Sequence, residues 1–362
     1  MIAEYEAIFK QAIEKKASDI HIVVGVPYIL RVNGSLVKLG REVEKDDVLE
    51  YINRMLNDEQ KQELMRVGDI DLAVELEDVG RFRINIYKQK GTYAIAARTI
   101  GDSVMTVEEL GLPNAIVNLA NLQKGMVLVT GPTGSGKSTT LASLIDLMNT
   151  TKDLHILTLE DPIEYVHKHK KSIVTQREIG RDSIEYKTAL RAALREDPDV
   201  ILIGEMRDAD SIQIAITAAE TGHLVFSTLH TIGAAKTIDR VIDVFRAEQQ
   251  QQIRTQLASV LQAVISQQLI PRLDGNGRVM ATEIMLVNPA IANLIRDSKT
   301  YQIDTQIQIG RKLGMQSMDN ALFELYQKKL ISQENALAYS QDQENFSKTY
   351  LKNISYGGSQ FY

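Results

Sequence analysis

The sequence contains no cysteine, which excludes disulfide bonds and zinc sites ligated by cysteine. It also has no run that approaches the roughly 18 apolar residues of a membrane-spanning helix. The N-terminal segment carries Glu4 and Glu6 and has no apolar core segment, which is not typical of a secretory signal. Positive charge is not in excess, because 41 Lys and Arg stand against 47 Asp and Glu. The resulting net charge of −6 argues against nonspecific nucleic-acid binding over the whole surface.

These absences predict a cytoplasmic protein with no membrane span of its own. The composition, 44% hydrophobic and 24% charged residues, is that of a soluble globular protein. A length of 362 residues favours two domains, or three.

The segment 131–138 reads Gly-Pro-Thr-Gly-Ser-Gly-Lys-Ser and matches G-x-x-x-x-G-K-[ST] at every fixed position. The apolar run 126–130 before it predicts a buried strand, and the spacing of apolar residues in 139–148 predicts a helix. In that context the backbone N–H groups and the helix N-terminus form a cradle for phosphates. Lys137 is expected to bridge the β- and γ-phosphates, and the Ser138 hydroxyl to ligate Mg²⁺. The alternative is a glycine-rich turn that binds no ligand. The predicted nucleotide-binding residues are Gly131, Pro132, Thr133, Gly134, Ser135, Gly136, Lys137, Ser138 and Thr139.

Residues 1–100 predict a small α+β domain with a largely antiparallel sheet. In 81–87 the side chains alternate, with Phe82, Ile84 and Ile86 on one face and Arg81, Arg83 and Asn85 on the other. The predicted elements are a helix over 2–16 with Tyr5 on its apolar face, a strand near 19–24, a hairpin over 27–39 that turns at Asn33-Gly34, helices over 46–56 and 58–67, and strands over 70–76, 81–87 and 92–99.

After a predicted linker at 101–113, residues 114–342 alternate strand and helix patterns, which predicts an α/β domain with a parallel-rich sheet. Its predicted strands are 126–130, 155–159, 200–203 and 224–228. The later part is predicted to be mostly helical, with a helix over 183–195 capped by Asp182, a long helix over 248–270 and a short strand near 278–285. Residues 343–362 are polar and predict a flexible tail.

Acidic residues follow two of the predicted strands. Glu205 comes after the strand 200–203, where ligand sites of α/β folds form, and is expected to support Mg²⁺. Glu160, Asp161 and Glu164 follow the strand 155–159, and a nearby Mg²⁺ would relieve their mutual repulsion. Glu164 is predicted to orient the attacking water, with Glu160 next in order, and the choice of general base between Glu164 and Glu205 stays open. The alternatives are a solvated strand-end carboxylate and an acidic helix cap.

Two histidines flank the predicted strand 224–228. His223 and His230 are expected to sense the γ-phosphate or to contact a neighbouring subunit, and the alternative is a structural role. Arg81, Arg83 and Arg98 of the first domain are candidates for an arginine brought to the γ-phosphate, with a solvated sheet face as the alternative.

Together these motifs resemble the family of hexameric motor ATPases of secretion systems and type IV pili, over residues 1 to about 340. The matching motifs are the Walker A loop 131–138, the aspartate-rich box 160–165, an atypical Walker B segment 197–208 and the histidine box 222–231. The stretches 189–208 and 234–245 resemble the pilus retraction, twitching-motility branch, and the lack of a tetracysteine motif favours the same branch. Ala292 and Asp297 depart from that branch's pattern, and hydrolysis is expected to survive the change.

The resemblance implies a PAS-like first domain, whose Arg83 and Arg98 close onto the nucleotide, and a RecA-like second domain. It implies a P-loop ATPase that uses ATP and Mg²⁺, forms a homo-hexamer and drives pilus retraction. The ring would work in the cytoplasm at the inner face of the inner membrane, on a platform protein of the pilus machine. The preference for ATP comes from this resemblance.

Two alternatives belong to other classes. One is a scaffold subunit with little turnover, which joins a ring with a paralogous ATPase. The other is a RecA-like nucleic-acid motor, against which stand the net charge and the lack of a basic and aromatic stripe.

Overall fold

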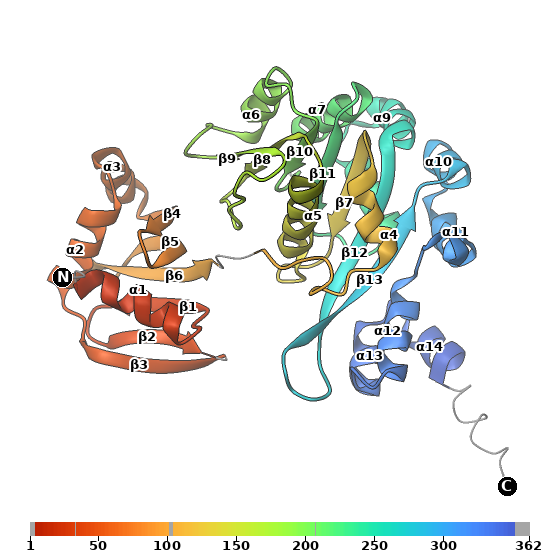
Figure 1. Ribbon diagram of the computed structural model, residues 1–362. Coiled ribbons are helices and arrows are strands. Elements are labelled where there is room, and N and C mark those ends of the chain that lie inside the picture. The colour runs from red at the N-terminus through yellow and green to blue at the C-terminus, as the bar shows by residue number, and fades with distance from the viewer. Residues whose placement is uncertain (1–3, 33, 101–103, 207, 352–362) are drawn as a thin grey trace, which may run out of the picture. The chain divides into compact units, whose positions relative to one another are not determined.

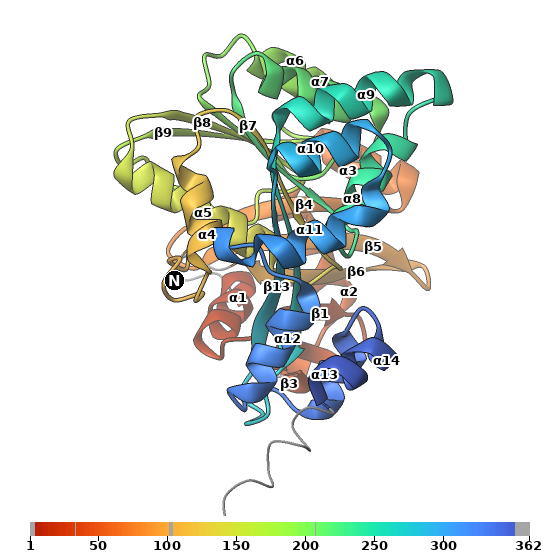
Figure 2. The same cartoon turned by 90° about the vertical axis from the view of Figure 1, so that its right-hand side faces the viewer.

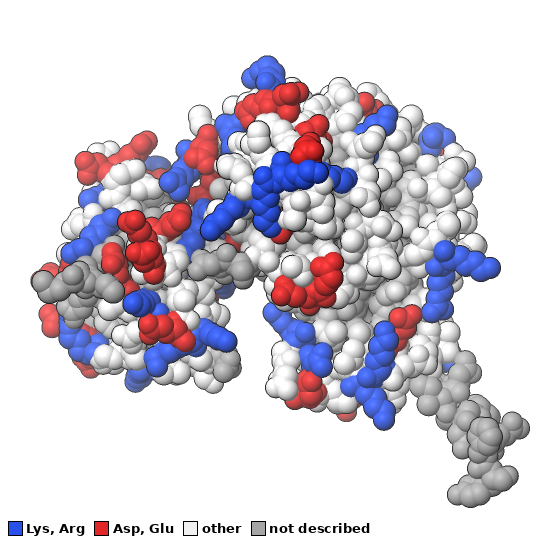
Figure 3. Space-filling view, viewed as in Figure 1, with Lys and Arg blue, Asp and Glu red and all other residues white. Residues whose placement is uncertain are grey.

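The computed structural model describes residues 4–32, 34–100, 104–206 and 208–351 (Figure 1). The chain divides into two compact units: the first comprises the residues up to Val104 together with Pro162–Val166, and the second comprises the other residues from Met105 on. Figure 3 shows one face of each unit, and acidic and basic side chains lie beside one another on both. Within the described ranges, no helix is both long and apolar enough to cross a membrane.

The first unit contains a six-stranded sheet in the order β3-β2-β1-β6-β5-β4, and every neighbouring pair is antiparallel. This confirms the predicted α+β unit with an antiparallel sheet. Its strands are β1 (Asp19–Val23), β2 (Pro27–Val32), β3 (Ser35–Glu42), β4 (Asp69–Leu76), β5 (Gly80–Gln89) and β6 (Thr92–Ile100). Its helices are α1 (Glu4–Glu14), α2 (Lys45–Met55) and α3 (Asp58–Val67).

Strand β5 has the alternating burial that its sequence predicts. Phe82, Ile84 and Ile86 are fully buried, because they face the core of the first unit. Phe9 of α1 packs edge-on against Phe82, with ring centroids 4.7 Å apart. The opposite face of β5 therefore carries the polar side chains, including Arg83.

The second unit contains a seven-stranded sheet in the order β13-β12-β7-β11-β10-β8-β9, in which only the β12–β13 pair is antiparallel. The predicted parallel-rich sheet is thus confirmed. Its strands are β7 (Gly125–Thr130), β8 (His155–Glu160), β9 (Ile173–Glu178), β10 (Val200–Ile203), β11 (Leu224–Leu229), β12 (Leu261–Pro271) and β13 (Arg278–Leu286).

Helices cover both faces of this sheet, and a cluster of short helices follows it in the chain (Figure 2). They are α4 (Asn114–Val117), α5 (Lys137–Thr151), α6 (Tyr186–Ala193), α7 (Ala209–Glu220), α8 (Ala234–Asp243), α9 (Ala247–Val260), α10 (Pro289–Arg296), α11 (Ile303–Ile309), α12 (Met318–Gln327), α13 (Gln333–Tyr339) and α14 (Gln343–Phe346). Short 3-10 helices span 118–121, 300–302 and 310–313, and a π-helix spans 347–351.

The long helix predicted over 248–270 is wrong beyond Val260. The helix α9 ends there and the chain continues as β12, between β7 and β13. Six consecutive residues, 263–268, are buried in β12. A strand buried on both faces has a nearly continuous apolar sequence, which periodicity alone does not distinguish from a buried helix.

The start of α6 also differs from its prediction. The helix begins at Tyr186 with Glu185 at the N-cap, whereas Asp182 was expected to cap it. The carboxylate of Asp182 instead accepts a hydrogen bond from the Glu178 N–H, at 2.8 Å, in the turn that ends β9. The strand β9 itself was not predicted.

The flexible tail predicted from residue 343 is wrong for residues 343–351, which form α14 and the π-helix. Phe346 is fully buried, and the Tyr350 hydroxyl donates to Asn320 Oδ1 at 2.6 Å, so aromatic packing holds this segment. In the predicted linker, Val107 and Leu112 are buried in the core of the second unit.

Some predicted features fall outside the described residues. They are the tail 352–362, residues 101–103 of the linker, Asn33 of the predicted turn, Arg207 of the predicted Walker B segment, residues 2–3 of the first predicted helix and the side chain of Tyr5.

Candidate functional site

The loop 131–136 joins the end of β7 to the start of α5 near the middle of the second sheet. Gly131, Gly134 and Gly136 have φ angles of 139°, 77° and 88°, a region that favours glycine. A Cβ atom at Gly131 would also lie only 2.2 Å from the backbone oxygen of Gln267 in β12. Glycine is therefore required at 131 both for its conformation and for the close approach of β12.

Lys137, the first residue of α5, directs its ammonium group back into this loop. Its Nζ donates to the carbonyl oxygens of Gly131, at 2.8 Å, and Pro132, at 3.1 Å. The residue is only 9% exposed, while the neighbouring Ser138 is exposed at the first turn of the helix. The loop thus presents a nearly buried cation and an accessible hydroxyl side by side.

Three buried polar atoms around the loop have no hydrogen-bond partner in the described part of the chain: Ser135 Oγ, Thr130 Oγ1 and Gln267 Oε1. Buried polar groups are nearly always hydrogen-bonded, so such atoms indicate a place for a polar ligand or water. The other end of the Gln267 side chain donates to the Ser135 carbonyl at 2.8 Å and holds the loop. Together with the glycine cradle and Lys137, the Ser135 and Thr130 hydroxyls can donate to a phosphate group, whereas Gln267 Oε1 can only accept, as from a water.

His230 and Glu205 meet beside Lys137. Glu205 lies two residues beyond β10 and His230 directly follows β11, and these strands are parallel neighbours. His230 Nε2 lies 3.2 Å from Glu205 Oε1, and His230 Nδ1 lies 3.5 Å from Lys137 Nζ. Because an ammonium only donates, Nδ1 is the acceptor, which leaves the Nε2–H to donate to Glu205. The structure therefore brings three of the predicted site residues into one chain of contacts.

Glu205 and Ser138 supply the oxygen ligands that Mg²⁺ prefers. Among the residues that the structure describes, no group of three or more His, Cys, Asp or Glu side chains is arranged to hold a metal ion. Magnesium at nucleotide sites usually takes one or two protein oxygens, with phosphates and waters as the other ligands. The two residues fit that pattern.

The other acids of the prediction lie on the neighbouring strand and its loop. Glu160 ends β8, and its Oε1 accepts from Thr158 Oγ1 at 2.7 Å and from Gln176 Nε2 at 3.2 Å. Glu164 is exposed in the loop between β8 and β9. The contacts that join Lys137 to His230 and His230 to Glu205 do not include Glu164.

Of the two roles predicted for His223, sensing the γ-phosphate does not fit the loop of its own chain, and contact with a neighbouring subunit stays a prediction. His223 precedes β11, and its Nδ1 lies 2.9 Å from the Ala218 carbonyl. Strand β11 has six residues, which at about 3.3 Å per residue separates its ends by roughly 20 Å. The residues before and after a strand are close in sequence but lie at opposite ends of that strand. His223 is therefore remote from the phosphate loop of its own chain.

Arg83 and Arg98 lie directly opposite each other on β5 and β6 of the first unit. Together with Asp19 and Asp71 they line a small cavity of about 180 Å³. The Arg98 guanidinium donates to Asp19 Oδ1 at 3.0 Å. Burial opposes ionisation of Asp19, but hydrogen bonds from Ser18 and Arg98 outweigh it and hold the pKa of this carboxyl below its usual value. Arg81 lies two residues earlier on the same face of β5 and is half-buried.

Gln267 is the site residue that the sequence analysis missed. It lies in the run that was predicted to continue as a helix, whereas the structure forms strand β12 there. The predicted helix gave no reason to expect Gln267 beside the phosphate loop. The polar triplet Ser266-Gln267-Gln268 inside an apolar run was the available signal.

Comparison with known proteins gives consistent relatives. The family model of the Type II/IV secretion system proteins matches residues 1–361. The Type IV pilus retractation ATPase PilT of Pseudomonas aeruginosa is 50% identical over 331 residues, 91% of this chain and 96% of that protein. A twitching motility protein of Neisseria gonorrhoeae is 46% identical over 336 residues, 92% of this chain and 90% of that protein.

The fold agrees with these relatives. The crystal structure of the pilus retraction motor PilT with bound ADP has a TM-score of 0.90 at 45% identity, and the match covers 96% of this chain and 100% of that one. Because the family model matches nearly the whole sequence and the relatives match over almost their full length, the chain belongs to the Type II/IV secretion system protein family.

Proposed function

We propose that this chain is an ATP hydrolase whose turnover drives the retraction of type IV pili, as in twitching motility. The observation that carries the proposal is the contact chain Lys137–His230–Glu205 at a glycine phosphate loop. It occurs in a chain that is 50% identical, almost from end to end, to a pilus retraction ATPase. The relative named for bound ADP supports a nucleotide as the ligand of this loop.

The phosphate-holding groups are the backbone N–H groups of 133–136 and the Lys137 ammonium, which now donates to two loop carbonyls. Phosphate oxygens are charged acceptors and replace those carbonyls with stronger hydrogen bonds. Ser138 and Glu205 hold Mg²⁺, whose charge, when bound, stabilises the negative charge of the transferred phosphoryl group. The glycine cradle fixes the position of the reacting phosphate.

The residues that act on the attacking water are acids that follow β8 and β10 in the chain. Glu164, in the loop after β8, orients the water, and Glu160, which Thr158 and Gln176 hold by hydrogen bonds, is next in order. Glu205 is the alternative general base. His230 reports the occupancy of the phosphate site to Glu205, because its two ring nitrogens face Lys137 and Glu205.

We further propose that Arg83 and Arg98 supply positive charge to the γ-phosphate when the two units close. Both lie on the polar face of the first sheet, and the Arg98 side chain is 69% exposed. A guanidinium brought to the transferred phosphate stabilises its transition state.

The assembly and partners belong to the same proposal. The chain forms a homo-hexamer in the cytoplasm, at the inner face of the inner membrane, and works on the platform protein of a type IV pilus. The pilus retraction relatives and the family match support this assignment. The domains of the proposal are a first domain of residues 1–100 and an ATPase domain that includes the segment from Met105 and the helices up to residue 351.

The test is ATP turnover by Lys137→Ala, with Lys152→Ala as the matched control. The two lysines lie at opposite ends of α5, and each donates to backbone carbonyls, since Lys152 Nζ lies 2.5 Å from the Ala120 oxygen. Lys137→Ala is expected to abolish hydrolysis while leaving the circular dichroism spectrum unchanged, because the lysine contributes charge to phosphates. Lys152→Ala is expected to keep it. Near-normal turnover of Lys137→Ala at saturating ATP would refute the site.

The pilus part of the proposal needs a cellular readout. The wild-type chain is expected to restore twitching to a host that lacks its retraction ATPase, and Lys137→Ala is not. Restoration by both, or by neither, would contradict ATP-driven retraction.

A further inference from the structure

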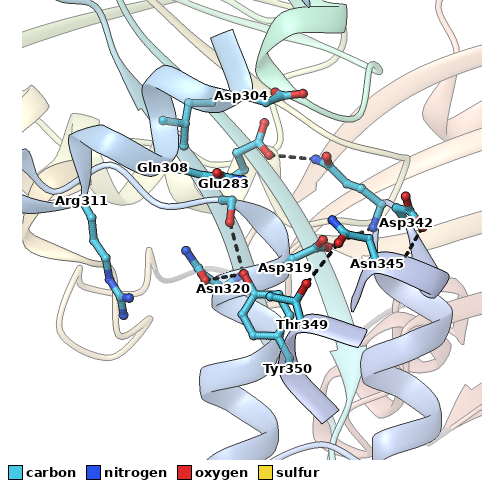
Figure 4. A pocket seen from close by; sticks show the side chains of 13 residues that line it. Glu283, Asp304, Gln308, Arg311, Asp319, Asn320, Asp342, Asn345, Thr349 and Tyr350 are labelled. Carbon is cyan, nitrogen blue, oxygen red and sulfur yellow. Dashed lines mark hydrogen bonds between the residues drawn. The ribbon is translucent and has the colours of Figure 1, made fainter. Parts of the chain in front are cut away.

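Glu283 in β13 is a buried carboxylate that joins two helices. It is 2% exposed, and its Oε1 accepts from the backbone N–H of Ala234 at 2.7 Å. Its Oε2 accepts from Gln341 Nε2 at 2.8 Å and from the backbone N–H of Met318 at 3.4 Å. Figure 4 shows this side chain at the edge of a cavity of about 610 Å³, with its hydrogen bond drawn toward the segment that leads into α14.

All three partners of this carboxylate are neutral donors, and two of them are backbone N–H groups at helix starts. Ala234 is the first residue of α8 and Met318 is the first residue of α12. Helix N-termini carry unsatisfied N–H groups and a positive potential, so they stabilise a carboxylate. Burial raises the pKa of Glu283, the bond from Ala234 opposes this, and the Asp304 carboxylate raises it again. The side chain is thus costly to bury, and its hydrogen bonds offset that cost.

On one side, Glu283 fixes the loop that carries His230. Ala234 follows His230 by four residues, and the loop between them is held by further bonds. The Gly233 N–H donates to Ser266 Oγ at 2.9 Å, and the Thr237 hydroxyl donates to the Gly233 carbonyl at 2.8 Å. Since Gly233 leads directly into Ala234, a displacement of α8 from Glu283 displaces the loop. His230, at the start of that loop, contacts both Lys137 and Glu205.

On the other side, Glu283 fixes the C-terminal helical cluster, by which we mean α12, α13 and α14. Met318 begins the cluster, and Gln341 lies between α13 and α14. The Gln341 N–H also donates to Asp319 Oδ1 at 3.1 Å. One carboxylate therefore holds two separate points of the cluster.

We propose that Glu283 is a positioning residue of the ATP site, which joins the His230–Gly233 loop to the C-terminal helical cluster. The binding of nucleotide at the phosphate loop and the position of α12 then depend on one another. Such coupling is reciprocal, so a change at either end alters the other. The inference rests on the proposed ATP hydrolysis and adds to it a route from the nucleotide to the last helices of the chain.

Glu283→Gln tests this route without removing volume. A carboxamide keeps one acceptor oxygen and turns an NH₂ group toward N–H donors, so at least one of the two helix starts loses its acceptor. Loss of a charge-assisted hydrogen bond that positions His230 is expected to lower kcat about tenfold. KM is expected to change by no more than about twofold, because the phosphate loop itself keeps its bonds.

Hydrogen exchange measures the second half of the coupling. In the wild type, ADP is expected to slow amide exchange in the first turn of α12, and in Glu283→Gln this response is expected to disappear. Gln341→Ala removes one donor from the cluster and leaves the Ala234 bond intact, so it is expected to weaken the α12 response with a smaller loss of kcat.

Ile284→Val is the matched control. It shortens a buried apolar side chain in the same strand and leaves Glu283 its partners. If Glu283→Gln and Ile284→Val lower kcat equally at equal loss of melting temperature, Glu283 is only structural and the proposal fails. In either orientation of the carboxamide one link of the route is lost, so an unchanged α12 response to ADP in Glu283→Gln also overturns it.

Three further outcomes test this inference, and one of them separates it from the proposed function. If Glu283→Gln does not fold, Gln341→Ala decides, and an unchanged α12 response in that variant rejects the coupling. A wild-type chain that binds ADP without hydrolysing ATP rejects the proposed function alone, since the exchange experiment still measures the coupling. An α12 segment that does not respond to ADP in the wild type rejects the coupling.

Discussion

Gly131→Ala and Gly134→Ala form a matched pair that tests why the phosphate loop contains glycine. At Gly134 the backbone has φ of 77°, but an added Cβ meets no atom within 4 Å. At Gly131 φ is 139°, and the Cβ would lie 2.2 Å from Gln267 O and 2.7 Å from Ser135 Oγ. The Gln267 oxygen belongs to the backbone of β12, which is paired on both sides, so it cannot move away cheaply. The pair therefore separates conformational strain from steric conflict.

The expected magnitudes follow from these contacts. A non-glycine residue in the left-handed region costs roughly 1–2 kcal/mol, which is the whole expected effect of Gly134→Ala. The rarer φ at 131 costs about 1–3 kcal/mol. Forcing an extra methyl group into a packed site adds about 1–3 kcal/mol more. Because the conformational cost at 131 is no smaller than at 134, the steric part alone makes Gly131→Ala lose about 1–3 kcal/mol more than Gly134→Ala, and 1 kcal/mol is roughly a factor of 5 in an equilibrium constant.

The loss can show in either of two measurements. If the loop keeps its position, the free energy of unfolding falls, and urea titrations followed by circular dichroism detect it. If the loop moves away from β12, the affinity for ADP falls instead, by about the same free energy. The free energy of unfolding and the affinity for ADP are measured for both variants. The two losses in free energy are then added for each variant. Equal total losses for Gly131→Ala and Gly134→Ala would refute the argument from the Gln267 contact.

Two other predictions concern a proposed transition-state residue and a buried histidine. Arg83→Ala is expected to keep its stability within about 0.5 kcal/mol, as a surface change usually does, and to lower kcat far more than it weakens ATP binding. A stable variant with unchanged kcat would show that this arginine only faces solvent. His167 is 7% exposed, and burial lowers its pKa, against the charge of Asp146, which raises it. The pKa of His167 in the folded chain lies below the unfolded value of about 6.5, so the unfolded chain binds more protons at lower pH. The free energy of unfolding that depends on His167 is therefore fully present above about pH 6.5 and is lost as the pH falls below it. His167→Gln is expected to flatten the decrease of urea midpoints between about pH 7 and 5, and an unchanged slope would contradict this.

The sequence alone determined the features that are local in the chain. The phosphate loop is one contiguous segment, so its residue types and their order specify the cradle and the lysine directly. The alternation in β5 likewise predicted which side chains are buried, since a strand with one exposed face repeats every two residues. The family resemblance had the same origin, because its motifs are short and ordered along the chain.

The tertiary structure decided what depends on contacts between distant segments. The order β12-β7-β11-β10 places Gln267, Lys137, His230 and Glu205 together at one edge of the sheet, and it leaves His223 at the other. The apolar run after Val260 became a strand because neighbours on both sides supply its hydrogen bonds, which no local pattern records. Glu283 acquired its partners from three segments, at Ala234, Met318 and Gln341. A carboxylate's role is set by the donors that surround it, and only the folded chain brings those donors to it.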